Sequence, residues 1–239
     1  MSIGMKPNKP VTAGSFKTGP HQRLREMYAA LLKAYGPRQW WPADTPFEVV
    51  LGAILTQGTS WRGVEGSIAN LRTEGLLTVD GIRAVSEERL REAIRPSGFV
   101  LRKAACIQAF VRLLDDHYDG SLDRMASQPD SALRPQLLAI RGIGPETADA
   151  ILLYALGHPV FVVDEYFRRV ATRHELADAN ARYADLQSLG DLAIASATPE
   201  ETARNGNELH ALIVEVGKRH CGTSPRCAGC PLQPLLPAQ

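Results

Sequence analysis

The sequence has no long hydrophobic run, and only four of its 239 residues are cysteine. No apolar stretch approaches the roughly 20 residues that a membrane-spanning helix needs, so no membrane segment is predicted. The first 20 residues also lack the apolar core of a secretory signal peptide. Because four cysteines without such a signal do not suit a disulfide-stabilised secreted protein, we expect a reducing, cytoplasmic location, next to the nucleoid if the source is bacterial.

An excess of charge of either sign is also absent. The 27 lysine and arginine residues face 26 aspartate and glutamate residues, a formal net charge of +1. The net charge therefore does not indicate nucleic-acid binding, and any DNA-binding surface must be a local patch. Residues 1–20 contain no acidic residue. We expect a disordered tail there, with an organelle transit peptide as the alternative.

Alternating apolar and polar residues, which mark a half-buried strand, are rare, and we expect an all-α fold. Apolar residues recur instead at spacings of three and four. The first such pattern predicts a helix that begins at Leu24 and ends at Gly36. Further helices are predicted over about 46–57, 63–72, 78–85, 87–94, 102–117, 131–140 and 146–156, from 164 onward, within 176–204 and over 208–220.

The most informative stretch is a hairpin between two predicted helices, with the sequence Gly142-Ile143-Gly144-Pro145. Two glycines allow a sharp turn and a close approach of the backbone to a partner. Pro145 and Glu146 suit the first turn of the next helix, where free N–H groups attract a phosphate. By itself the hairpin is equally typical of a tight helix–helix turn without a ligand.

Five segments together resemble the endonuclease III superfamily of helix-hairpin-helix DNA glycosylases, over roughly residues 24–232. They are residues 47–61, residues 94–104, the hairpin, residues 162–170 and the C-terminal cysteines. Within that superfamily, WWP followed by FE, LGAILTQGT, RPSGF and GIGPETADAIL is most similar to the endonuclease-III-like 3-methyladenine DNA glycosylases.

The resemblance implies two domains. A six-helix barrel would occupy residues 41–158, and a discontinuous terminal helical domain with the cysteine cluster would occupy 21–40 and 159–239, after the tail 1–20. DNA would lie across the groove between the domains. The implied partner is double-stranded DNA with a damaged base, and we expect a monomer.

Asp164 follows a short apolar run and is the expected catalytic residue by this resemblance. Hydrolysis of an N-glycosidic bond builds positive charge on the sugar, which a carboxylate stabilises while it activates a water. The alternative is an N-cap for the next helix, since aspartate is a preferred N-cap residue. Both roles are compatible, because capping would fix the direction of the carboxylate.

Glu146 stands where bifunctional members of the superfamily carry a nucleophilic lysine. A carboxylate does not form an imine with a sugar aldehyde. The resemblance therefore predicts base removal without strand cleavage. Lys103 is a possible substitute nucleophile, but we expect it on an exposed helix and give that role little weight.

The three tryptophans of the chain are expected on the wall of the base pocket. Trp40 and Trp61 would sandwich the extruded base, with Trp41 beside them and Pro42 on the pocket wall, as the resemblance implies. An indole face attracts a positively charged methylated purine. The structural alternative for these tryptophans is packing in the core or at a hinge.

The resemblance also assigns contacts with DNA. Gln57 would fill the gap left by the flipped base, and Phe99 would wedge beside the opposite strand, where an apolar side chain replaces lost stacking. The alternative for Phe99 is a core residue that anchors its loop. The remaining residues expected at the phosphates are Arg95, Arg102, Lys103, Gly142 and Gly144.

The C-terminal cysteines nearly match the superfamily's iron–sulfur pattern. Cys221, Cys227 and Cys230 supply three thiols, but the fourth position falls at Leu236. A [4Fe–4S] cluster would then need another fourth ligand, such as His220 or a solvent species. Zinc bound by three cysteines and a histidine and a loop without metal are the alternatives.

Taken together, the sequence indicates a monofunctional DNA glycosylase that favours alkylated purines of the 3-methyladenine type. Two other interpretations are open. One is an oxidised-pyrimidine glycosylase of the endonuclease III type with weak or no lyase activity. The other is a noncatalytic DNA-binding or redox-sensing module.

Overall fold

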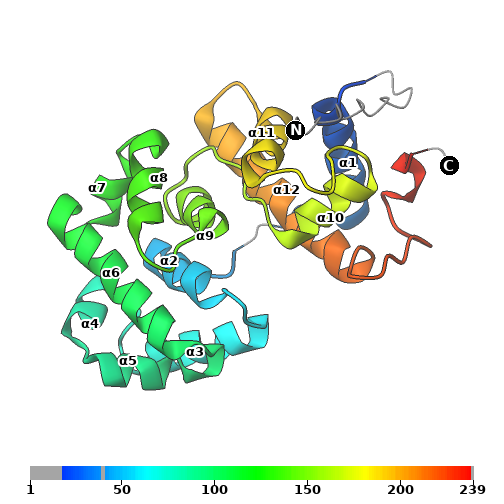
Figure 1. Cartoon of the computed structure of the whole chain (residues 1–239). Coiled ribbons are helices and arrows are strands. Elements are labelled where there is room, and N and C mark those ends of the chain that lie inside the picture. Colours follow the sequence, from blue (N-terminus) through cyan, green and yellow to red (C-terminus); the bar gives the residue numbers. More distant parts are fainter. Residues whose placement is uncertain (1–17, 39–40, 238–239) are drawn as a thin grey trace, which may run out of the picture.

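The computed structural model describes residues 18–38 and 41–237, and these form an all-α fold (Figure 1). Within these residues the only β-type pairing is an isolated bridge between Cys221 and Pro225. The predicted fold class is therefore confirmed. No helix in the described ranges is long and apolar enough to cross a membrane.

Helices from the middle of the chain surround one hydrophobic core. They are α2 (Pro46–Leu55), α3 (Trp61–Thr73), α4 (Val79–Ala84), α5 (Glu87–Ala93), η1 (Arg95–Ser97), α6 (Val100–Tyr118), α7 (Leu122–Ala126), α8 (Asp130–Ala139), α9 (Pro145–Ala150) and η2 (Ile151–Ala155). Local sequence sets several starts: the side chains of Thr45, Ser60, Thr78 and Ser86 each accept a hydrogen bond from the backbone three residues on.

A second core joins the two ends of the chain. It lies among α1 (Pro20–Tyr35), α10 (Glu165–Arg173), α11 (Tyr183–Ile194) and α12 (Pro199–Arg219), with η3 (Gln233–Leu235) beyond them. The blue α1 and the orange α12 lie together at one end of the molecule in Figure 1. Two separate cores support the proposed division into a barrel over 41–158 and a terminal domain over 21–40 and 159–239.

The segment 160–163 connects the two cores. Val160 and Val162 are buried in the barrel core, whereas Phe161 and Val163 are buried in the terminal core. This alternation is the period of an extended chain, whose successive side chains point to opposite sides. The segment therefore lies between both cores. Asp164 follows it and directly precedes α10, at the junction of the two bodies.

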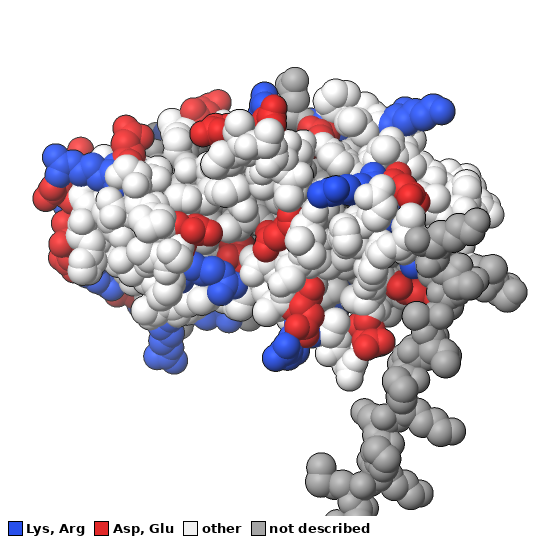
Figure 2. Space-filling model, turned by 90° about the horizontal axis from the view of Figure 1, so that it is seen from above, with Lys and Arg blue, Asp and Glu red and all other residues white. Residues whose placement is uncertain are grey.

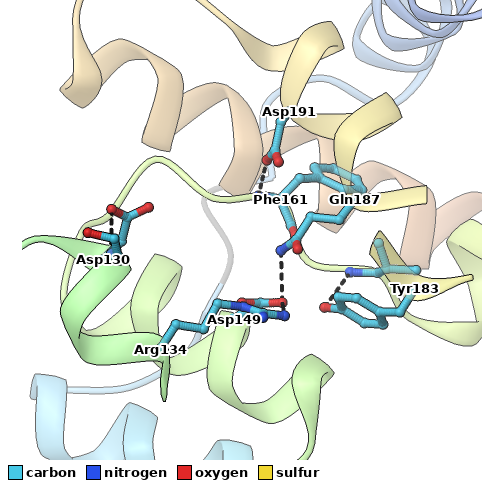
Figure 3. A network of polar contacts seen from close by, with 9 residues as sticks. Asp130, Arg134, Asp149, Phe161, Tyr183, Gln187 and Asp191 are labelled. Atoms are coloured by element: carbon cyan, nitrogen blue, oxygen red, sulfur yellow. Dashed lines mark hydrogen bonds and ion pairs between the residues drawn. The ribbon is translucent and has the colours of Figure 1, made fainter. Parts of the chain in front are cut away.

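A polar network around one buried carboxylate joins the barrel to α11 (Figure 3). The fully buried Asp149 of α9 accepts two hydrogen bonds from Arg134 of α8, at 2.7 and 3.1 Å. Gln187 of α11 donates to the same carboxylate at 2.8 Å and to the carbonyl of Phe161 at 3.1 Å. The network therefore ties the connecting segment to both bodies.

Several helix boundaries differ from the sequence-based prediction. The first helix begins at Pro20, four residues early, because Pro20 occupies the first turn after Gly19. The last begins at Pro199 instead of 208, where Thr198 caps it. The five-residue α7 was not predicted. The helix expected over 146–156 changes from α9 to one π-helical turn, η2.

Charged side chains are mixed on the face shown in Figure 2. Lysine and arginine are interspersed with aspartate and glutamate, and neither sign dominates this face. This mixture agrees with the near-zero net charge of the chain. On this face, phosphate contacts would therefore depend on individual residues at defined places.

Candidate active site

The hairpin after α8 turns at Gly142, whose φ of +106° is a conformation that side chains disfavour. Ile143 is buried beneath the turn, while Gly144 is exposed and has an extended backbone at the start of α9. No side chain caps α9 at Gly144. The structure therefore presents the exposed backbone of this hairpin next to the first turn of a helix.

Asp164 is the N-cap of α10. Its Oδ1 accepts a hydrogen bond from the backbone N–H of Phe167 at 2.7 Å, which fixes the carboxylate. The second oxygen, Oδ2, lies 3.6 Å from Nε2 of His210 on α12. The capping role considered for Asp164 is confirmed, and it leaves one carboxylate oxygen directed toward His210.

His210 and Tyr154 complete this group, and neither was predicted from the sequence. The hydroxyl of Tyr154 lies 2.5 Å from Nδ1 of His210. Burial raises the pKa of Tyr154 well above its ordinary value, so the hydroxyl keeps its proton. Nε2 of His210 faces Asp164, and the His210 tautomer sets which group donates in the bond with Tyr154. In the sequence, both residues stand within apolar helical segments, which gave no indication of a functional role.

Glu146 lies in the first turn of α9, on the wall of the same cleft. Glu146 is exposed toward the cleft, and desolvation by the neighbouring protein raises its pKa to about 7. Nearby Asp164 raises the pKa further, while His210 lowers it. Glu146 therefore titrates near neutral pH beside the Asp164 carboxylate.

The cleft between the two bodies has a volume of about 520 Å³. Residues from both bodies line it, including Trp41, Gln57, Trp61, Glu146, Asp164 and His210. This volume falls in the range of sites that hold a small organic ligand. The structure thus brings together the expected catalytic residue, the lysine-position glutamate and two tryptophans.

The tryptophans meet edge to face. The rings of Trp41 and Trp61 have centroids 6.0 Å apart and planes 80° apart, and Trp41 also contacts Tyr154 at 5.0 Å. Trp41 and Trp61 are therefore not a parallel pair. Pro42 does not line the cleft but lines a neighbouring cavity of about 490 Å³, which Trp41 and Trp61 also line. Trp40 lies outside the described residues.

Gln57 and Phe99 lie on two adjacent loops. The Gln57 amide donates to the carbonyl of Gly142 at 2.8 Å and to the hydroxyl of Thr147 at 3.0 Å, so it rests on the hairpin. Phe99 is 65% exposed, which contradicts the alternative of a core residue. The Arg102 guanidinium lies 5.5 Å from the centre of the Phe99 ring.

Arg95 is exposed beside these loops, as expected, but Lys103 is not. We expected Lys103 to be exposed and to contact phosphates, and this is wrong. Its side chain on α6 is 1% exposed and points into the barrel. Its ammonium donates to three protein oxygens. The same burial speaks against Lys103 as a substitute nucleophile, since the residues lining the cleft do not include it.

The three cysteines of the C-terminal loop, with His220 and Leu236, line a small cavity of about 30 Å³. Arg173 donates to Sγ of Cys221 at 3.1 Å, and Nδ1 of His220 lies 3.1 Å from the carbonyl oxygen of Arg226. Among the described residues, no three His, Cys, Asp or Glu side chains are placed to hold a metal ion.

This donor set does not fit a four-thiolate cluster. Leu236 lies at the cavity where a fourth thiolate would be needed, and a leucine side chain has no lone pair to donate. We therefore derive no chemical step through a metal or cluster.

Comparisons with known proteins agree with this geometry. Residues 51–191, more than half of the chain, match the HhH-GPD superfamily of base excision DNA repair proteins. MJ1434 of Methanocaldococcus jannaschii, whose name is "Putative DNA repair glycosylase", is 38% identical over 91% of this chain and 97% of its own length. Endonuclease III of Bacillus subtilis is 29% identical over 80% of this chain and 81% of its own.

Solved structures show the same fold. The 3-methyladenine DNA glycosylase MagIII of H. pylori, bound to 1,N6-ethenoadenine, has a TM-score of 0.71 and 28% identity, over 84% of this chain and 98% of its own. A non-covalent endonuclease III–DNA complex has a TM-score of 0.73 at 24% identity, over 90% of this chain and 94% of its own. With its all-α fold, glycine hairpin and cleft between two cores, this chain belongs to the HhH-GPD superfamily of base excision DNA repair proteins.

Proposed function

We propose that this protein is a monofunctional DNA glycosylase that hydrolyses the N-glycosidic bond of an alkylated purine in double-stranded DNA. The observation that carries the proposal is the place of Glu146. It lies beside Asp164 on the wall of a cleft lined by tryptophans, at the position expected of a nucleophilic lysine. Membership of the superfamily supports the glycosylase activity, and the cleft supports its finer assignment.

Asp164 supplies the charge that the reaction needs. As the base departs, positive charge grows on the sugar, and an ionised carboxylate fixed by a helix start stabilises it without reorganising. Oδ1 is held by the N–H of Phe167, and Oδ2 faces His210. The carboxylate also orients the water that attacks the sugar. The products are the free base and an abasic site.

Glu146 separates hydrolysis from strand cleavage. Formation of a Schiff base requires an amine, and a carboxyl group at this position supplies none. With a pKa of about 7, the group carries a proton on a large fraction of molecules near neutral pH. In that form it does not repel Asp164, and it can donate a hydrogen bond into the cleft.

Alkylated purines suit the aromatic wall of the cleft. A 3-methyladenine base carries positive charge, so it is a good leaving group and is attracted to the indole faces of Trp41 and Trp61. MagIII, named as a 3-methyladenine glycosylase and bound to a modified adenine, supports this substrate class at 28% identity. Trp40 stays a predicted partner of the sandwich.

DNA contacts are proposed at three places. The backbone of Gly142 and Gly144 binds phosphates of the damaged strand, and the exposed Phe99 enters the duplex beside the opposite base. Gln57 exchanges its two hydrogen bonds with the hairpin for contacts in the gap left by the flipped base. Arg95 and Arg102 lie near Phe99.

The deciding experiment measures base release from two DNAs, one methylated with a labelled alkylating agent and one carrying a single thymine glycol. Each oxidised-pyrimidine reaction is run with and without hot alkali, which separates base loss from strand scission. Release of 3-methyladenine without strand scission supports the proposal. Alkali-independent cleavage at thymine glycol would overturn it in favour of an endonuclease III activity, and DNA binding without any release would favour a noncatalytic module.

A further inference from the structure

Lys103 is a buried cation that the proposed chemistry does not use. It lies in the first turn of α6, and its side chain is 1% exposed. Burial, with a smaller contribution from Arg102, lowers its pKa to about 8. A buried ammonium is tolerated when its donors are paired with acceptors. The partners of Lys103 therefore indicate what the side chain is for.

The ammonium of Lys103 has three acceptors for its three N–H donors. It donates to the carbonyl of Leu55, to the hydroxyl of Thr59 and to the carbonyl of Ser97, each at 2.7 Å. The Thr59 hydroxyl in turn donates a hydrogen bond to the carbonyl of Ser97. Each donor is thus used once, and every acceptor is in the protein.

These acceptors lie in or next to the segments that carry Gln57 and Phe99. Leu55 ends α2 directly before the loop 56–60, Thr59 lies in that loop, and Ser97 ends η1 two residues before Phe99 in the segment 95–99. The loops also touch directly, since a Cβ added at Gly58 would lie 3.5 Å from the Phe99 ring. The hydrogen bonds of the Lys103 ammonium therefore link the two loops to each other.

Phe99 is held in an unfavourable position. Its φ of 46° and ψ of 35° are left-handed, which non-glycine residues adopt at a cost, and its ring is 65% exposed. The Lys103 backbone N–H donates to the Phe99 carbonyl at 3.1 Å, and Nζ lies 6.0 Å from the ring centre. Both ends of Lys103 therefore support the conformation that exposes the phenyl ring.

We infer that Lys103 is a positioning residue that fixes the loops 56–60 and 95–99 relative to each other, so that Gln57 and Phe99 reach the duplex together. This inference rests on the proposed function, which assigns both residues to the opened duplex. Lys103 acts before the chemical step, when the damaged base leaves the stack. A base that is already unstacked does not need this help.

The test compares one lesion in two settings. A single 1,N6-ethenoadenine is placed opposite thymine in a duplex, or inside an unpaired bubble, with 2-aminopurine next to it as a reporter of unstacking. Single-turnover base release and 2-aminopurine emission are measured for the wild type and for Lys103→Met, which keeps the length but removes the three donors. Arg112→Met, an exposed position on the same helix, is the matched control.

We expect Lys103→Met to release the paired base at least about tenfold more slowly than the wild type, with a much smaller change in the bubble. The 2-aminopurine emission on duplex binding should fall in parallel, and Arg112→Met should match the wild type. An equal loss in both settings would overturn the inference, because it would mean a merely structural role. Unchanged rates in both settings would also overturn it.

The two proposals fail in different ways. If the wild type releases no base from either DNA but opens the duplex, and Lys103→Met does not, the glycosylase proposal fails and the positioning role stands. If the wild type releases the base and Lys103→Met matches it, the reverse holds. Thr59→Val, which removes a single hydroxyl from the network, is the second variant should Lys103→Met not fold, and the same preference for the paired lesion is expected.

Discussion

Asp164 caps α10 with one carboxylate oxygen, and the proposed catalytic role falls to the other. Oδ1 caps α10 and Oδ2 faces the cleft next to His210. Asparagine caps a helix about as well as aspartate does. The exchange of one for the other therefore separates charge from structure.

Asp164→Asn should lower the rate of base release by about 10²–10⁴-fold, because the charge that assists departure of the base is lost. The melting temperature and DNA affinity should stay close to those of the wild type. Single-turnover release and binding to the same lesion DNA check this prediction. A variant that keeps its rate would show that Asp164 serves only as a cap.

Glu146 should make stability depend on pH. Its folded pKa of about 7 exceeds the ordinary 4.5, so between these values the unfolded chain gives up its proton first. The free energy of unfolding should therefore fall as pH rises from about 4.5 to about 7 and then level off. Glu146→Gln should remove this part of the slope.

Urea unfolding of both proteins at pH 5 and pH 8 measures the effect of Glu146 as a difference between them. The comparison is needed because burial also raises the pKa of Asp191, to about 6, and that group contributes a slope of the same sign in both proteins. Equal slopes in wild type and variant would contradict the assigned pKa of Glu146.

At the scale of elements, α10 and α12 approach each other closely at one glycine. A Cβ added at Gly217 of α12 would meet the ring of Tyr166 at 2.2 Å, and Tyr166 lines the cleft two residues after Asp164. Side-chain bulk at this point would push apart the helices that carry Asp164 and His210. The closeness of these two helices is thus part of the site.

Gly217→Ala should destabilise the protein by about 1–3 kcal/mol from overpacking, partly offset by the better helix propensity of alanine. Base release should also fall, because α10 moves. Gly206→Ala in the same helix is the control, since its added Cβ meets the flexible end of Ile194 at 3.0 Å. Chemical denaturation and single-turnover release compare them. Equal losses in both variants would argue against a specific contact.

For the whole molecule, the decisive feature is the junction of the two bodies. The connecting segment is held on its α11 side by two further hydrogen bonds: the N–H of Phe161 donates to Asp191 at 2.8 Å, and the N–H of Val163 donates to the Tyr183 hydroxyl at 3.3 Å (Figure 3). These bonds satisfy the backbone of a segment that has no strand partner. They set the place at which Asp164 emerges.

Arg134→Met should cost about 3 kcal/mol, because it leaves the buried Asp149 carboxylate without its cation. Arg124→Met, which breaks an exposed pair with Asp119, should cost less than about 1 kcal/mol. Guanidinium unfolding of both variants checks the contrast. Similar losses would mean that the junction does not depend on this ion pair.

The cysteine loop allows a test by completing the donor set. Leu236→Cys places a fourth thiol at the cavity that already has three. After anaerobic reconstitution with iron and sulfide, this variant should hold more iron and absorb more strongly in the visible range than the wild type. Cys227→Ser is the control. Equal iron in the variant and the wild type would mean that residue 236 does not limit binding.

The sequence by itself determined the helices, the hairpin and the family. Caps such as Thr45 and the glycines at 142 and 144 act within a few residues, and so they are readable locally. The same holds for the replacement of a lysine by Glu146, which needs no structure to be noticed. Short helices such as α7 were not predicted, because five residues are too few to show a helical periodicity.

Only the tertiary structure decided which groups meet. His210 and Tyr154 lie 46 and 10 residues from Asp164, in runs whose apolar neighbours hide them, and packing of α12 against η2 brings them to it. Lys103 was expected on an exposed surface, because a charged side chain is rarely buried. Two of its three acceptors, at Leu55 and Thr59, lie 48 and 44 residues away in the sequence, and no local pattern reveals them. Burial of a charge depends on partners that only the fold assembles.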